Sequence, residues 1–500
     1  MAEGEPAYFE DHSARSDDLG RRALRGGIVS IGMQYGNGVL QIAAAIALAR
    51  ILAPEDFGLV AIVTVVTSFA PALIDFGLAD AITQRSRITQ GQVSSLFWFS
   101  VGLGLATAVV LAAFSPLIAA IYREPRLEPI ALCMGASFVL WGTSNLHLAL
   151  LRRSMRFGTI ARIQMSSTFI GAAVAISLAL CGFGYWALVL RPVAHAASQS
   201  LGAWLLCRWR PGRPAFGDDV RSILRFGLHV VGFWITATLA RAVDRIGLGL
   251  FYRPEVVGYY QNATALFEYS ISLALGQVQT VGSASLSKLQ SDPVALRQKY
   301  EAALSALAFF VMPMAAILSV TAEDLTALLL GEKWRPAGVL LSIIALRGIF
   351  QVVEASQGWL NISIGRADRL RNWGIVSLGA QIAGVLAGLS FGPKGVATAS
   401  VIATALVAIP AINYAGRPIG VGADLVIRAV SPQFIGAVSC LAAGWYLHVA
   451  ILGAYPGFMR ILISGALCSC VYLLIVAGLF RLTEPIKVAG SIVQDLLGPR

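Results

Sequence analysis

The sequence predicts an all-α polytopic membrane protein with about fourteen transmembrane helices. Of the 500 residues, 57% are hydrophobic and only 13% are charged, and the mean hydropathy is +0.72. A soluble domain carries about 25% charged residues, so too little polar surface remains here to cover a soluble globule. Apolar runs of about 20 residues, long enough to span a bilayer as helices, recur along the whole chain.

An internal repeat organises these helices. The turn Pro54-Glu55-Asp56-Phe57-Gly58 follows an apolar segment, and Pro254-Glu255-Val256-Val257-Gly258 repeats the pattern later in the chain. Upstream residues match in the same register: Leu24, Arg25, Gly27 and Gly32 correspond to Leu224, Arg225, Gly227 and Gly232. Six predicted helices separate the two copies. Because this number is even, the chain crosses the membrane in the same direction at both copies. The sequence therefore predicts two parallel-repeat six-helix lobes and two extra C-terminal helices.

The predicted organisation follows this repeat, because the connections are short and leave no room for an inserted soluble domain. Its parts are a cytoplasmic N-terminal tail over 1–26, an N-lobe over 27–207, a cytoplasmic linker over 208–225, a C-lobe over 226–416, the extra helices over 417–480 and a cytoplasmic C-terminal tail over 481–500.

The net charge of +11 is a signal of membrane topology. Lys and Arg residues are about three times as frequent in the loops on the side of the N-terminus as in the alternate loops, and cytoplasmic loops carry such an excess. Both termini are therefore expected in the cytoplasm. Because the basic residues follow the loops, binding of nucleic acid is not expected.

No pattern typical of catalysis or metal binding is present. The six cysteines all fall inside or at the end of apolar segments and lack metal-ligand spacing with histidines, so we interpret them as buried, unreactive thiols. The sequence contains no glycine-rich phosphate loop of the Walker type. We therefore expect no metal, no cofactor and no enzymatic activity.

Several segments carry a family resemblance. They are "PEDFG", "DFGLADAITQR", "GFGYWALV", "VGYYQNA" and "LLGEKWRPAGVLL", and the resemblance runs over residues 20–430. The chain resembles bacterial polysaccharide/oligosaccharide-lipid flippases, the polysaccharide transporter family of the multidrug/oligosaccharidyl-lipid/polysaccharide exporter superfamily. The resemblance implies a MATE-like fold with two lobes around a central cavity in the bacterial inner membrane. It also implies transport of undecaprenyl-pyrophosphate oligosaccharide by alternating access, for exopolysaccharide or lipopolysaccharide synthesis, with polymerase and chain-length proteins as partners.

Charged residues inside predicted helices are candidate site residues, because a charge at bilayer depth is costly. Arginine binds phosphate with a bidentate fork, so the arginines are predicted to bind the pyrophosphate. The carboxylates are predicted to couple transport to an ion or to act as counter-charges. Mutual ion pairing without a ligand is the alternative for each of them. The arginines are Arg191, Arg241, Arg245 and Arg347, and the acids are Asp75, Asp244, Glu268 and Glu354.

Aromatic rings and amides are the side chains expected to bind sugars, and four of them are predicted to do so here: Trp141, Asn145, Trp234 and Trp359. The alternative is that these residues pack at membrane interfaces, where tryptophan is enriched. His195 follows Arg191 by four residues and is interpreted as a packing residue that shares its helix face.

Competing functions remain open at this stage. A multidrug exporter or a peptidoglycan-precursor flippase would have the same fold, although several intramembrane arginines favour an anionic substrate. A membrane polysaccharide polymerase or ligase would act on the same lipid-linked sugars. Such enzymes need a sizeable outer loop with charged residues, and the predicted outer loops are short and poor in charge.

Overall fold

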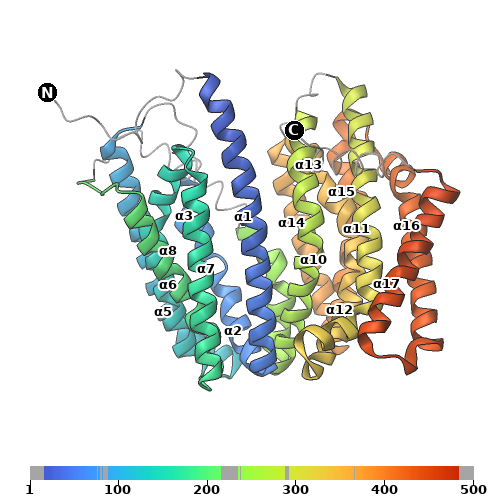
Figure 1. Ribbon diagram of the computed structural model, residues 1–500, viewed down its shortest axis with the longest axis horizontal. Helices are drawn as coiled ribbons and strands as arrows, with labels where there is room; N and C mark the ends of the chain where they lie inside the picture. The colour runs from blue at the N-terminus through green and yellow to red at the C-terminus, as the bar shows by residue number, and fades with distance from the viewer. Residues whose placement is uncertain are drawn as a thin grey trace. The chain divides into compact units, whose positions relative to one another are not determined.

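The computed structural model describes residues 16–75, 88–214, 238–287, 292–364 and 366–482, with 77, 78, 82, 235 and 236 between these ranges. All regular secondary structure in these ranges is helical, as predicted (Figure 1). The chain divides into two compact units. The N-terminal unit comprises residues 1–242 and 252–258, and the C-terminal unit comprises residues 243–251 and 259–500.

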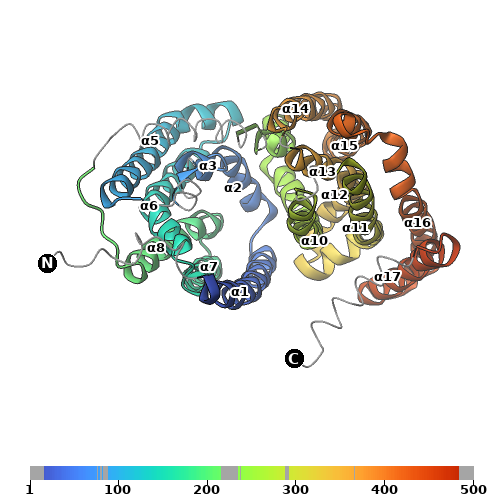
Figure 2. The same ribbon diagram turned by 90° about the horizontal axis from the view of Figure 1, so that it is seen from above.

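The helices of the N-terminal unit are α1 (Ser16–Ile51), α2 (Pro54–Thr67), α3 (Ala70–Asp75), α5 (Gln90–Tyr122), α6 (Leu127–Arg153), α7 (Phe157–Leu180) and α8 (Trp186–Leu206). Helix α1 begins inside the predicted N-terminal tail. Seen end-on, α1 lies beside α7 and α7 lies beside α8 (Figure 2). Helix α6 packs against both α5 and α8, so it lies at the centre of this unit.

Residues 238–251 form a helix that crosses the division between the units. The C-terminal unit then contains α10 (Pro254–Ser287), which starts in the N-terminal unit, α11 (Pro293–Leu330), α12 (Arg335–Ala345), α13 (Arg347–Ser363), α14 (Ala367–Leu389), α15 (Gly392–Gly416), α16 (Ala423–Ala450) and α17 (Gly457–Leu473). Helix α17 continues as a π-helical turn, Leu474–Leu479.

Within the described residues, nine helices are long and apolar enough to cross a membrane. The pair α12 and α13, bent by 47° at its break, forms a tenth if it is one span. The predicted number of fourteen is therefore not confirmed. Residues 226–234 and 237 of the predicted segment 226–248 lie outside the described residues, and α8 is less apolar than the nine helices because Arg191, His195 and Gln199 interrupt its sequence.

The first copy of the repeated turn is fixed by three different interactions. Pro54 occupies the first turn of α2, where a missing backbone N–H costs nothing. Asp56 Oδ2 accepts a hydrogen bond from the Ala53 N–H at 3.0 Å and caps the helix. Glu55 pairs with Arg126 at 2.6 Å, and Arg126 also bonds Glu124 at 2.7 Å, which holds the pKa of Glu124 below its ordinary value.

The two copies of the turn pack directly on one another inside the N-terminal unit. A Cβ atom built on Gly58 would overlap the carbonyl group of Pro254, and a Cβ atom built on Gly258 would overlap the carbonyl oxygen of Pro54. The contact is reciprocal, as expected when two copies of one motif meet about a local two-fold axis. Glycine is therefore required at both positions by close approach of the backbones.

A buried ion pair joins the last two helices to α11. Arg460 of α17 lies 2.6 Å from Asp324 of α11, whose side chain is only 5% exposed. His448 of α16 lies 3.9 Å from the same carboxylate. Three helices thus converge on one buried acid, and removal of either charge of the Asp324–Arg460 pair would leave the other uncompensated.

We predict that Gly58→Ala destabilises the protein by about 1–3 kcal/mol, because an added methyl group must push two backbones apart. The matched control is Gly102→Ala in α5, where nothing lies within 4 Å of the built Cβ. The control should be neutral or slightly stabilising, since alanine favours a helix over glycine. Thermal unfolding of both variants in the same detergent measures the difference, and equal midpoints would refute the packing argument.

Candidate functional site

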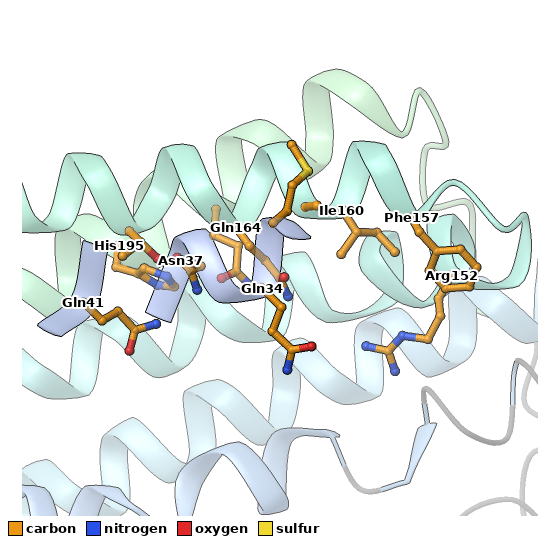
Figure 3. Close-up of a pocket in the computed structure, with 12 residues that line it drawn as sticks. Gln34, Asn37, Gln41, Arg152, Phe157, Ile160, Gln164 and His195 are labelled. Atoms are coloured by element: carbon orange, nitrogen blue, oxygen red, sulfur yellow. The ribbon is translucent and has the colours of Figure 1, made fainter. Parts of the chain in front are cut away.

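The N-terminal unit contains a polar cavity of about 470 Å³. Four helices of this unit line it: α1, α6, α7 and α8. Its lining residues are Met33, Gln34, Asn37, Gln41, Arg152, Phe157, Ile160, Ala161, Gln164, Thr168, His195 and Gln199. Figure 3 shows His195, Asn37 and Gln41 on one side of the view, Arg152 with Phe157 on the other, and Gln34 and Gln164 between them.

Helical periodicity explains how each helix presents its polar residues to the cavity. Gln34, Asn37 and Gln41 are three and four residues apart on α1, so they share one face. Gln164 and Thr168 are four apart on α7, and His195 and Gln199 are four apart on α8. A stripe of polar side chains on an otherwise apolar helix requires a polar environment, which the cavity supplies.

The cavity extends from the start of α7 to about the middle of that helix. Phe157 begins α7 and Thr168 lies eleven residues further along it, a distance of about 16 Å at the rise of an α-helix. His195 precedes Leu206, the end of α8, by the same number of residues. The hydrocarbon core of a bilayer is about 30 Å thick. If Phe157 stands at one face of that core, Thr168 and His195 lie near its midplane and Arg152 lies at that face.

Close packing holds the deep end of the cavity in place. A Cβ atom built on Gly171 of α7 would lie 3.1 Å from the Arg191 carbonyl oxygen and 3.2 Å from His195 Cβ. Helices α7 and α8 therefore approach closely at this point, which fixes His195. Helix α6 is bound to α8 by the Thr143 and Ser200 hydroxyls, 2.8 Å apart, and by Trp204 Nε1, which donates to the Thr143 carbonyl at 3.1 Å.

The lining is cationic at one end and neutral at the other. Arg152 contributes a positive charge, and the twelve lining residues include no carboxylate. At the neutral end, Asn37 Oδ1 is buried without a hydrogen-bond donor from the described part of the protein. A buried polar atom of this kind is normally satisfied, so Asn37 offers an acceptor to a bound molecule that carries donors.

A second polar group lies in the C-terminal unit and contains four of the predicted site residues. The Tyr260 hydroxyl donates to Asp244 Oδ2 at 2.6 Å, and Arg245 Nη1 donates to Gln261 Oε1 at 2.9 Å. Arg245 and Arg347 both interact electrostatically with the Asp244 carboxylate. We call Asp244, Arg245, Arg347 and Glu354 the C-terminal charge cluster.

The other members of this cluster have partners of their own. Ser377 Oγ donates to Glu354 Oε1 at 3.3 Å, and Arg347 interacts electrostatically with the same carboxylate. The guanidinium of Arg347 also lies over the ring of Phe267, 5.1 Å from its centroid. Each charge of the cluster thus interacts with a group of the same unit.

The remaining predicted charges lie outside this cluster. Arg191 is half-buried on α8, one turn before His195, and it does not line the cavity. Asp75 is half-buried at the end of α3, also in the N-terminal unit. Arg241 and Glu268 have exposed side chains.

The predicted sugar-binding residues do not line the cavity either. Trp141 packs against Phe138 with ring centroids 5.9 Å apart, and Asn145 Nδ2 is buried without a described acceptor. Trp359 is 1% exposed on α13 in the C-terminal unit. Trp234 lies outside the described residues. In the described part of the chain, no group of three or more His, Cys, Asp or Glu side chains could hold a metal ion.

Sequence reasoning missed the cavity residues because it searched for charges and tryptophans. The amides of α1, α7 and α8 and the arginine at the end of α6 were not singled out, and His195 was interpreted as a packing residue. Three amides at helical spacing inside the apolar segment of α1 were the available signal. That signal identifies a polar face, but it does not show which other helices complete the site.

The arrangement of helices defines the class of protein. The chain is similar in structure to a lipid II flippase, MurJ, in an inward closed conformation, with a TM-score of 0.69 at 15% identity, over 91% of this chain and 99% of that one. A multidrug resistance MATE family transporter in an inward-facing conformation matches with a TM-score of 0.57 at 14% identity, over 78% and 98%. These likenesses establish a MATE-like fold of the kind found in polytopic membrane transporters.

The chain belongs to the polysaccharide biosynthesis protein family, whose model matches residues 47–338. It is 26% identical to the lipopolysaccharide biosynthesis protein WzxC of Escherichia coli, over 64% of this chain and 66% of that protein. It is 25% identical to the teichuronic acid biosynthesis protein TuaB of Bacillus subtilis, over 61% and 64%. The succinoglycan biosynthesis transport protein ExoT of Rhizobium meliloti is 25% identical, over 66% and 67%. The matches thus span about two thirds of these relatives.

We predict that the cavity admits water-soluble reagents. In a variant whose six native cysteines are replaced by alanine, Gln164→Cys should react with a charged methanethiosulfonate, because a thiol must ionise in water to attack it. Phe169→Cys is the matched control, since Phe169 is 62% exposed on the outer surface of the same helix and should face lipid. A rate at Gln164→Cys as slow as that at Phe169→Cys would contradict the prediction that water enters the cavity.

Proposed function

We propose that this protein is a flippase. It moves undecaprenyl-pyrophosphate-linked oligosaccharide repeat units from the cytoplasmic to the periplasmic leaflet by alternating access, for exopolysaccharide or lipopolysaccharide synthesis. The observation that carries this proposal is the amide-lined cavity that reaches the midplane of the bilayer. Amides both donate and accept hydrogen bonds, so they can replace water around sugar hydroxyls. The family and the names of the relatives support the same substrate class.

The orientation of the chain gives the cavity a direction. The loops on the same side of the membrane as the N-terminus carry the excess of Lys and Arg. This excess supports an inner-membrane protein with both termini in the cytoplasm. Helix α6 ends and α7 begins on that side. Arg152 and the polar face of α1 would then be accessible from the cytoplasmic leaflet, where lipid-linked sugars are assembled.

The C-terminal charge cluster has a different proposed role. Asp244 and Arg245 are hydrogen-bonded to Tyr260 and Gln261, which supports a counter-charge and packing role for these two residues. Coupling to an ion through Glu354, or through Asp75 or Glu268, stays a prediction. Pyrophosphate binding by Arg191, Arg241 and Arg347 also stays a prediction, as do polymerase and chain-length proteins as partners.

The rival functions differ in what the cavity must bind. A multidrug exporter of cationic compounds would need carboxylates, and the cavity lining has an arginine and no carboxylate. A polymerase or ligase would need reactive groups at the outer surface, whereas the predicted outer loops are short and poor in charge. A peptidoglycan-precursor flippase would bind a similar head group, so only the identity of the lipid that accumulates distinguishes it from the proposed function.

We predict that the double variant Gln34→Leu/Gln164→Leu traps lipid-linked repeat units in the cytoplasmic leaflet. Each leucine is close in size to glutamine but leaves sugar hydroxyls unpaired, which costs about 1–3 kcal/mol per group. Together the two changes should slow transport by about tenfold or more. The assay complements a deletion strain and measures the leaflet accessibility of the repeat units and the amount of surface polysaccharide.

Gln298→Leu in α11 is the matched control, since it makes the same change at an exposed position outside the cavity and should complement fully. The proposal fails if complete repeat units reach the periplasmic leaflet in the deletion strain but stay unpolymerised, which is the result for a polymerase. Accumulation of peptidoglycan precursor, or a change in drug tolerance alone, would establish one of the rival transporters instead.

A further inference from the structure

The two ends of the N-terminal cavity differ in the ligand chemistry that they accept. At the membrane face, Arg152 offers N–H donors and a positive charge beside Phe157 (Figure 3). At the midplane, Asn37, Gln41 and His195 form a neutral polar surface, and Asn37 Oδ1 is a buried acceptor without a described donor. A molecule that satisfies both ends must carry an anion at one end and hydrogen-bond donors at the other.

We propose that the cavity binds the head group in a single orientation, with the pyrophosphate at Arg152 and the sugar rings deeper, against Asn37, Gln164 and Thr168. This inference rests on the flippase function proposed above. A sugar hydroxyl can donate to Asn37 Oδ1, whereas an ionised pyrophosphate only accepts hydrogen bonds. The reversed orientation would place an anion against a lone pair at the midplane and leave Arg152 facing hydroxyls.

The position of Arg152 gives a second, independent reason. The pyrophosphate of a polyprenyl lipid resides at the level of the lipid head groups, because it is the junction between the hydrocarbon chain and the sugars. Arg152 is the penultimate residue of α6 and lies at the same level. The sugars can therefore enter the cavity by about 16 Å while the pyrophosphate and the lipid stay at the membrane face.

The charge on Arg152 suits this task. A guanidinium binds phosphate oxygens with two parallel hydrogen bonds and stays charged at any physiological pH. Arg191 lies on α8 near the deep end, but its side chain does not line the cavity. Arg152 is thus the single arginine among the twelve lining residues. The neutral deep wall should bind sugar hydroxyl groups in preference to an anion.

Binding of two probes to the full-length protein in nanodiscs tests the orientation. The probes are farnesyl pyrophosphate and the same molecule carrying a linear chain of three hexoses on its pyrophosphate, the hexosyl probe, which is long enough to span the roughly 16 Å between the two ends of the cavity. Wild type should bind the hexosyl probe more tightly. Arg152→Gln should weaken both probes by about tenfold, since a charge-assisted contact to the shared pyrophosphate is lost. Asn37→Leu should weaken the hexosyl probe by about tenfold and leave farnesyl pyrophosphate unchanged.

Arg162→Gln is the control for charge alone, because Arg162 is an exposed arginine of α7 outside the cavity, and it should leave both affinities unchanged. The orientation is overturned if Asn37→Leu weakens both probes equally, if Arg152→Gln affects only the hexosyl probe, or if wild type does not distinguish the probes. None of these three results would contradict the flippase function if the double variant Gln34→Leu/Gln164→Leu still traps lipid-linked repeat units in cells. If the double variant does not trap them, the function itself is refuted.

Discussion

The requirement that polar groups be satisfied inside a bilayer determines where the functional residues of this protein lie. A guanidinium, carboxylate or amide that faces lipid is costly, so each must find a polar partner within its unit. In the C-terminal unit, Asp244 and Arg245 meet Tyr260 and Gln261 across two helices. In the N-terminal unit, the amides of three helices meet around a cavity instead. The same constraint thus produces a packed cluster in one unit and a polar cavity in the other.

The repeated Pro-Glu-x-x-Gly turn shows how one motif can serve several structural purposes. Its proline and acidic residues start α2 and anchor it to Arg126, and all of these interactions are local or lie at an exposed surface. Exposed ion pairs of this kind stabilise a protein by about 1 kcal/mol at most. The glycine has the greater consequence, since Gly58 and Gly258 allow the two copies to touch through their backbones.

Hydropathy and charge were sufficient to predict the class of fold, because a bilayer imposes length and composition on every span. They could not predict the break between α12 and α13, which falls beside Arg347, a residue expected inside a single helix. The repeat predicted two related halves. It did not predict that the two turns contact each other, because the contact depends on tertiary packing.

The sequence identified the charges that meet in the C-terminal unit but not the N-terminal cavity, for a comparable physical reason. Intramembrane charges are rare, so Asp244, Arg245, Arg347 and Glu354 could be found by inspection, and the structure brings these four residues together. Amides are less unusual in helices, and Gln34 and Asn37 become informative only when α7 and α8 lie opposite them. Arg152 looked like an ordinary loop charge of the positive-inside pattern, because its position at the mouth of a cavity depends on the fold.

The most direct test of the account is a transport measurement with purified components. The protein is reconstituted into vesicles with a fluorescent lipid-linked oligosaccharide, and a membrane-impermeant reagent reports how fast the lipid crosses from one leaflet to the other. Wild type and Gln298→Leu should give rapid exchange, and Gln34→Leu/Gln164→Leu should slow the exchange by about tenfold or more. Wild-type protein that leaves the lipid in its original leaflet, or a double variant as fast as wild type, would contradict the assignment of the N-terminal cavity as the path of the sugar.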